Sequence, residues 1–213
     1  RPESPANDAS QEVRDQVYTD GFEQNLEAFF DMTTVALSCG LTRVVSMQLP
    51  NAGGLRSLAY GAGDYDFHEW YSHGTNPPKR WRGVEGANVT EDEHNKFLDA
   101  SPIIANKNRY HVELAARLAR KLQQVPEGDG TLLDNTVFMW CSEIAVGNTH
   151  SHRNLPILMA GSAGGYFKTG RFVSYGTERS TNDLLVNILN AFGQDVETYG
   201  DPQYCNGPLS GLT

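Results

Sequence analysis

The sequence predicts an α/β fold, a three-layer sandwich around a largely parallel sheet. Two almost continuous apolar runs, 136–141 and 155–160, are typical of strands that are buried on both faces of a sheet. Stretches with helical periodicity are interleaved with them, as in the α/β class. Only about three central strands can be recognised, fewer than such a sheet usually has. We therefore expect residues 1–213 to form a single α/β domain that is the C-terminal portion of a larger one, with irregular tails at 1–9 and 199–213.

A helix is expected first, over residues 22–39, and a strand over 43–49 follows it. In the helix, apolar side chains recur at intervals of three and four residues, and Gly40 is a natural end for this pattern. The side chains expected to face the core are Phe22, Leu26, Phe29, Phe30, Thr33 and Leu37. Residues 51–99 have no long periodic segment, and a long irregular stretch inside a compact domain is usually functional.

A second long helix is expected to begin at Ser101, which can cap it, with Pro102 at its first position. Its apolar face would consist of Ile103, Ile104, Tyr110, Leu114, Leu118 and Leu122. Beyond the two apolar strands, residues 166–175 are expected to form an edge hairpin, and Thr181 is expected to cap a last helix that ends at Gly193. The core face of that last helix would consist of Leu184, Leu185, Ile188, Leu189 and Phe192.

The charge and composition of the chain exclude some classes of partner. Its formal net charge is −9 and its pI is about 5.1, whereas nucleic acids and anionic membranes attract proteins with a basic face. No apolar run approaches the roughly 20 residues that cross a bilayer, so no membrane span is expected. Because the chain starts at Arg1 without a signal-peptide pattern, we expect a processed chain or a fragment. Cys39 and Cys141 are expected to be buried free thiols, and Cys205 is the better candidate for a disulfide.

Two predicted loops contain four of the six histidines. The first loop contains His68 and His73, and the second contains His150 and His152 together with Glu143. Each loop follows an expected strand. If these strands are parallel, both loops leave the sheet at its carboxyl edge and converge on one crevice.

The side chains of these two loops could bind a metal ion. Imidazole and carboxylate groups together are a ligand set for zinc, iron or manganese rather than for calcium or magnesium. Asp64 and His68 would share one face of a helical turn, and His150 and His152 would share one face of an extended segment. The alternative is that these are ordinary polar side chains in the surface loops of an acidic protein. Both interpretations are open at this point.

Other motifs are weaker. Lys79, Arg80 and Arg82 form the only basic cluster of the chain and could attract a phosphate or sulfate group, although such a cluster is more often a solvated loop. The glycine-rich stretch 161–165 resembles a phosphate-binding loop, but no helix is expected directly after it, so we expect a turn. The sequence has no Gly-x-Ser-x-Gly nucleophile elbow, Walker loop or Cys-x-x-Cys pair.

Five motifs taken together resemble one family. They are Leu37-Ser-Cys-Gly-Leu-Thr-Arg-Val, Phe67-His-Glu-Trp-Tyr-Ser-His, Gly128-Asp-Gly-Thr-Leu-Leu-Asp-Asn-Thr, Ser142-Glu-Ile and His150-Ser-His-Arg-Asn-Leu-Pro-Ile-Leu-Met-Ala-Gly. As a set they resemble the C-terminal half of a secreted bacterial family of unknown function, number fifteen fifty-two among such domains. The resemblance covers about residues 22–212, and that family is similar to the alkaline phosphatase and sulfatase superfamily.

This resemblance implies an alkaline-phosphatase-like fold with a metal site at the strand ends. In the superfamily, one metal is held by an Asp-x-x-x-His pair and a later histidine, and Asp64, His68 and either His150 or His152 match those positions. A second metal is held there by an adjacent Asp-His pair, where this chain has Glu143 and Ile144. Isoleucine cannot bind a metal, so the second site lacks one of its usual ligands. The resemblance also implies that the nucleophile lies in a preceding segment and that the protein is secreted or periplasmic, commonly through a twin-arginine signal.

Two functions follow as hypotheses. The first is a metal-dependent hydrolase of phosphate or sulfate esters, or a fragment of one, that acts on a small anionic ester with zinc as the first candidate metal. Glu143 would be a further ligand or a base, and His73 an acid near the leaving group. The second is a non-catalytic exported protein that keeps the fold and binds a protein partner. Ile144 favours the second hypothesis, and the clustered histidines favour the first.

Overall fold

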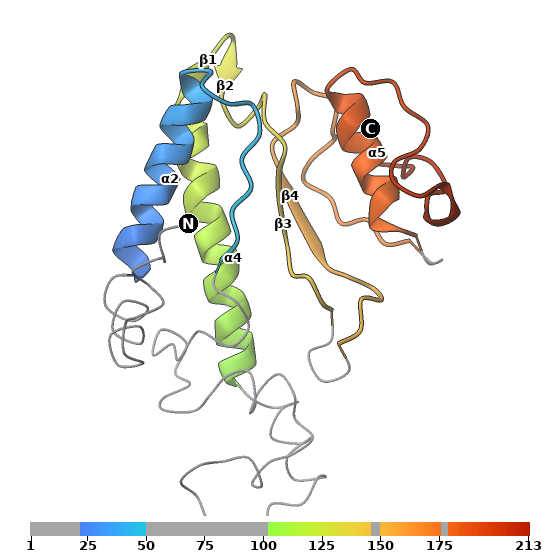
Figure 1. Ribbon diagram of the computed structural model, residues 1–213. Coiled ribbons are helices and arrows are strands. Elements are labelled where there is room, and N and C mark those ends of the chain that lie inside the picture. Colours follow the sequence, from blue (N-terminus) through green and yellow to red (C-terminus); the bar gives the residue numbers. More distant parts are fainter. Residues whose placement is uncertain (1–21, 50–101, 146–149, 176–178) are drawn as a thin grey trace, which may run out of the picture. The chain divides into compact units, whose positions relative to one another are not determined.

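The computed structural model describes residues 22–49, 102–145, 150–175 and 179–213 (Figure 1). The described residues belong to two compact units, and the helix α4 (Pro102–Gln123) begins in the first unit and ends in the second. The first unit contains residues 22–49, α4 as far as Ala116, and residues 150–151. The second unit contains the described parts of Arg117–Ala145 and His152–Thr213.

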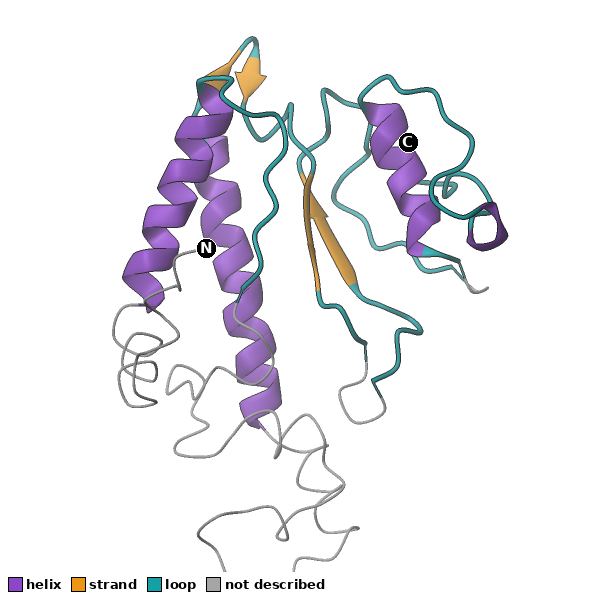
Figure 2. Ribbon diagram, in the orientation of Figure 1, coloured by secondary structure: helices purple, strands orange, loops and turns teal. Residues whose placement is uncertain are grey.

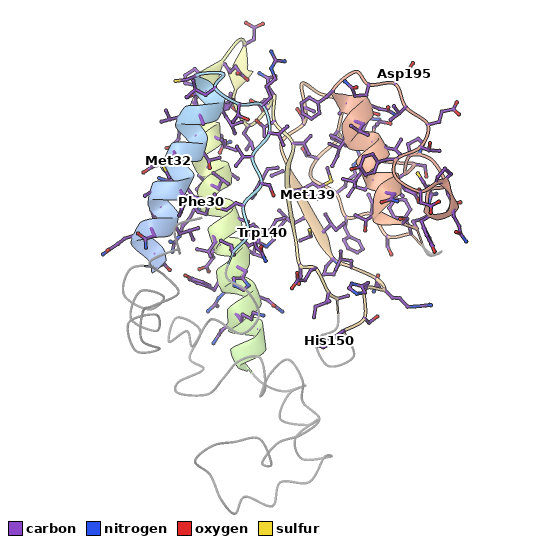
Figure 3. All side chains as sticks on the ribbon, viewed as in Figure 1. Phe30, Met32, Met139, Trp140, His150 and Asp195 are labelled. Carbon is purple, nitrogen blue, oxygen red and sulfur yellow. The ribbon has the colours of Figure 1, made fainter. Side chains whose placement is uncertain are left out.

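In the first unit, the helix α2 (Phe22–Ser38) packs against α4. Leu26 and Phe30 on α2 are buried, as are Tyr110 and Leu114 on α4. Figure 3 shows Phe30 on the side of α2 that faces α4. The Tyr110 hydroxyl also donates a hydrogen bond to the Glu23 carboxylate, which joins the two helices by a polar contact. Both predicted helices are therefore confirmed, together with most of the apolar faces that the three- and four-residue spacing indicated.

The opposite flank of α2 is also apolar but is exposed. Phe29, Met32 and Val35 are each more than half exposed, so the prediction that Phe29 faces the core is wrong. The predicted strand 43–49 is wrong as well, because residues 43–49 form no strand. Val44 is 81% exposed, and its main-chain groups bond locally to the Thr42 hydroxyl rather than to a neighbouring strand.

In the second unit, β3 (Phe138–Cys141) and β4 (Ile157–Ala160) form a two-stranded antiparallel sheet (Figure 2). The pairing runs from Phe138 opposite Ala160 to Cys141 opposite Ile157. Phe138 and Trp140 lie on one face, with ring centroids 6.4 Å apart, and Met139 lies on the other (Figure 3). Both faces of the strand are therefore apolar, and the side chains of residues 138–140 are only partly buried.

The predicted three-layer sandwich with a largely parallel, alkaline-phosphatase-like sheet is thus contradicted. The described residues form three α-helices and two antiparallel two-stranded sheets, the second made by β1 (Pro126–Glu127) and β2 (Gly130–Thr131). The two apolar runs form strands as predicted, but the strands pair antiparallel rather than parallel. A continuous apolar run indicates that a strand prefers burial on both faces, and it does not tell a parallel neighbour from an antiparallel one.

The turn 132–136 after β2 supports the start of the loop that follows β4. The Ser162 hydroxyl and the Gly164 N–H both donate to the Asp134 carbonyl, at 2.8 Å each. Gly161 has a φ of +82°, and a Cβ there would lie 2.2 Å from the Thr136 carbonyl oxygen. Only glycine fits this close approach of two backbones, because any side chain would collide with the turn.

The helix α5 (Thr181–Ala191) contributes part of the buried core of the second unit, which also includes Leu118, Leu132 and Phe167. Its N-cap is Ser180 rather than the predicted Thr181, and Ser180 forms a capping box with Asp183. Four α5 side chains are buried, and two of them are polar: Asp183, Leu184, Val186 and Asn187. The predicted core residue Phe192 is 56% exposed. The predicted hairpin 166–175 is wrong, since this segment forms a turn, bends and irregular chain without strands.

The three cysteines are free, as predicted for Cys39 and Cys141, but the prediction that these two are buried is wrong, and Cys205 forms no disulfide. Cys39 and Cys141 are exposed, whereas Cys205 is buried next to the short 3₁₀ helix η4 (Pro202–Tyr204). Among the described residues, no helix has the length and apolar character needed to cross a membrane.

Candidate functional site

The loop between β3 and β4 holds the predicted site residues that the structure describes. Glu143 and His152 are both exposed, and the His152 Nδ1 lies 2.9 Å from the Glu143 main-chain carbonyl oxygen. A carbonyl can only accept a hydrogen bond, so Nδ1 must be the protonated nitrogen in a neutral ring. The Nε2 of neutral His152 then keeps its lone pair. Metal-binding histidines are commonly oriented in this way, with the second ring nitrogen bonded to a carbonyl.

His150 lies in the same loop and has an unusual backbone. Its φ is 52°, and Asn154 also has a positive φ of 57°. Positive φ is uncommon outside glycine, although histidine and asparagine are among the residues that tolerate it best. The His150 side chain is exposed (Figure 3). His150 and Asn154 therefore both adopt a left-handed backbone conformation in this loop.

The remaining predicted site residues lie outside the described part of the chain. These are Asp64, His68 and His73, together with the basic cluster Lys79, Arg80 and Arg82. Their convergence with the 142–156 loop rested on two parallel strands. The predicted strand 43–49 is not formed, and the strand β3 pairs antiparallel with β4. The two loops therefore do not follow parallel strands, and the prediction that they meet at one sheet edge no longer has a basis. Within the described ranges, no group of three histidine, cysteine or acidic side chains could hold a metal ion.

The glycine-rich stretch 161–165 contains a turn, as expected, and the N–H groups of residues 163–165 already donate hydrogen bonds within the chain. The N–H groups of Ala163 and Gly164 donate to the carbonyls of Thr136 and Asp134, and that of Gly165 donates to the Ser162 hydroxyl. A phosphate-binding loop needs such N–H groups to point at the ligand. The N–H groups of residues 163–165 are therefore not directed at a ligand, and those of Ala163 and Gly164 join this stretch to the turn 132–136.

The most buried polar cluster was not predicted. Asp183 is fully buried on α5 and accepts hydrogen bonds from the Arg179 side chain at 2.7 Å and from the Asn206 N–H at 2.6 Å. Burial by itself would raise the pKa of Asp183, but these two bonds and the Arg179 charge hold that pKa below its usual value. The Ser180-x-x-Asp183 spacing is a capping-box signal that could have indicated the contact of Asp183 with the helix start.

His111 on α4 lies outside the predicted metal site, and its imidazole has a strongly perturbed pKa. Removal from water and the nearby Lys107 charge lower the pKa of His111 to about 4. Burial also lowers the pKa of Lys107, one helical turn earlier on α4. His111 is consequently neutral at pH 7, as expected for a histidine that serves packing.

Comparison with known proteins leaves the family open. No family model, curated protein or solved structure matches this chain.

Proposed function

We propose that the chain is a metal-dependent hydrolase of phosphate or sulfate esters, or the part of one that supplies some of its metal ligands. The observation that carries this proposal is the hydrogen bond between the His152 Nδ1 and the Glu143 carbonyl. It orients the imidazole and leaves Nε2 as a donor to a metal ion. The other support is the set of motifs around His68 and His150 that resembles a phosphatase-like family.

The donor set fits zinc better than magnesium or calcium, because it is rich in imidazole. The predicted ligands are Asp64, His68 and His150 or His152, and the described residues among them do not complete a site by themselves. A bound metal ion would act as a Lewis acid on the ester oxygen. Glu143 has an exposed carboxylate and would act as a base or a further ligand, and His73 would protonate the leaving group.

Metal analysis of the purified protein tests this proposal. Near-stoichiometric zinc, iron or manganese is expected in the unaltered chain and should fall at least tenfold in His68→Ala and in His152→Ala. His94→Ala is the matched control, because it removes a histidine that is not among the proposed ligands, and it should retain the metal. Hydrolysis of aryl phosphate and aryl sulfate esters is then measured on the metal-loaded protein. A folded protein that binds none of these metals would overturn the proposal.

A second candidate function is supported by the exposed flank of α2. An exported protein that binds another protein without catalysis would use an apolar surface, and Phe29, Met32 and Val35 form such a row on one helix. This function predicts that Met32→Glu leaves metal content and folding unchanged but abolishes co-purification of a partner. The same substitution would not affect ester hydrolysis if the first function is correct.

A further inference from the structure

The last eight residues of the sequence, 206–213, pack on the second unit as an irregular segment with bends at 207–208 and a turn at 210–211, and we call this segment the strap. The side chains that hold it form the clamp, defined as Lys168, Arg171, Tyr175, Arg179, Asp183 and Asn187. The first four come from the 166–179 segment, and the last two come from α5.

The clamp binds the main chain of the strap at almost every residue. Asn187 uses its side-chain amide twice, donating to the Leu209 carbonyl at 3.1 Å and accepting from the Leu209 N–H at 2.7 Å. Asp183 accepts from the Asn206 N–H, and Arg179 donates to the Gly207 carbonyl at 3.0 Å. The clamp side chains therefore satisfy main-chain groups of the strap that would otherwise need water or another backbone as partner.

The other end of the strap is held by the same kind of contact. Tyr175 donates to the Ser210 carbonyl, Arg171 to the Gly211 carbonyl and the Lys168 side chain to the Thr213 carbonyl, each at 2.9 Å. The Lys168 N–H donates to the Leu212 carbonyl at 2.9 Å. Each of these contacts is made to a main-chain group of the strap. The bound backbone conformation requires glycine at two positions, because Gly207 and Gly211 have φ values of +84° and +79°.

The strap has features of a detachable segment. Most of the contacts at its far end are exposed to water, so each is easily replaced by a hydrogen bond to solvent. Its only apolar side chains besides proline are Leu209 and Leu212, and both are partly exposed. The strap follows the buried Cys205, and Gly207 near its start has a φ of +84°, which glycine adopts readily.

We propose that the clamp is a peptide-binding site that the strap occupies in cis, and that the strap of a second copy of this chain can replace it. The strap of a second copy has the same main-chain groups and can form the same hydrogen bonds with the clamp. It is therefore the best-matched occupant. A tethered strap has an effective concentration of about 1 mM or more, so exchange in the unaltered chain requires comparable protein concentrations. This proposal is independent of the proposed metal-dependent function.

A peptide-binding experiment on the full chain tests it. Leu209→Pro removes the N–H that bonds to Asn187 and so weakens the strap in cis without altering the clamp. The probe is a fluorescent synthetic peptide of residues 206–213, followed by anisotropy. We expect at least tenfold tighter binding to Leu209→Pro than to the unaltered chain. Binding should be lost in the Leu209→Pro, Asn187→Ala double variant, and a peptide with proline in place of Leu209 should not bind.

Saturable binding that is equal in all variants, or no binding to folded Leu209→Pro, would overturn the proposal. If circular dichroism shows that Leu209→Pro does not fold, hydrogen exchange of the unaltered chain decides instead. The Leu209 N–H donates to the Asn187 side chain, and the Lys168 N–H donates to the Leu212 carbonyl. These two N–H groups should then exchange together at least tenfold faster than the N–H groups inside α5. Exchange of all these groups at one common rate would show that the strap opens only with global unfolding.

Discussion

Arg179 donates a hydrogen bond from its Nε to the carboxylate of Asp183, four residues later in the chain, at 2.7 Å, and the Asp183 side chain is completely buried. The chain offers a matched exposed pair with the same spacing, Arg109 and Glu113 on α4, at 3.8 Å. The exposed fractions of the side chains are 25% and 0% in the first pair and 72% and 59% in the second. The two pairs therefore separate the effect of burial from the effect of charge.

The first prediction concerns these two pairs. Asp183→Ala should lower the free energy of unfolding by roughly 3 kcal/mol, because it leaves the Arg179 charge and the Asn206 N–H without their partner. Glu113→Ala should lower it by at most about 0.5 kcal/mol, since an exposed pair is weak. Urea unfolding followed by circular dichroism measures both. Equal effects of the two substitutions would contradict the importance assigned to burial.

The second prediction concerns pH. The pKa of Asp183 is lower in the folded chain than its ordinary value of 3.8, so the ionised carboxylate stabilises the fold. This stabilisation is fully present above the unfolded-state pKa and is lost as the pH falls below about 4 and through the folded-state pKa. Asp183→Asn should be less stable than the unaltered chain at pH 6, and the difference should shrink below pH 4. A difference that does not change with pH would contradict this assignment.

The third prediction concerns His111. NMR titration of its imidazole should give a midpoint of about 4, and the ring should be neutral at pH 7. Because this folded-state pKa lies below the ordinary value of 6.5, the associated stability is present above pH 6.5 and is lost as the pH falls from there to about 4. Lys107→Met removes a nearby positive charge and should raise the midpoint. A midpoint near 6.5 in the folded protein would show that His111 is in contact with water.

The fourth prediction compares two glycines in one turn. Gly161→Ala places a Cβ 2.2 Å from the Thr136 carbonyl oxygen, whereas Gly165→Ala meets no atom within 4 Å. Both have positive φ, so Gly165→Ala should cost about 1–2 kcal/mol for its conformation alone. Gly161→Ala should cost clearly more, because the two turns must also move apart. Thermal unfolding of both variants measures the difference, and equal melting temperatures would contradict the close approach.

The helices were predictable because their signals are local. Leu114, Leu118 and Leu122 repeat at the helical period, and all three are buried on α4 as predicted. On α5 the same reasoning missed Asp183 and Asn187, since their burial depends on the strap, which is more than 15 residues away in sequence. Polar residues can be buried where distant main-chain groups satisfy them, and periodicity contains no information about those groups.

The sheets were predictable only in part. The runs around Met139 and Leu158 are strands, but their antiparallel pairing depends on contacts across the 142–156 loop. For the candidate site, the sequence indicated the residue types, and the described part of the chain supplies one oriented imidazole, His152. Its hydrogen-bond partner is the main chain of Glu143. A main-chain carbonyl is present at every position, so the sequence could not indicate this one.

The pairing of Cys141 with Ile157 means that the 142–156 loop starts and ends at directly opposite positions of the sheet. In an antiparallel ladder, such positions lie only about 5 Å apart, whatever the length of the chain between them. Insertions or deletions within the loop can therefore be accommodated without displacing either strand, and longer loops add little closure entropy. Among the described elements, this loop is the place where the protein can acquire new chemistry by length variation, and where a foreign sequence could be grafted for engineering.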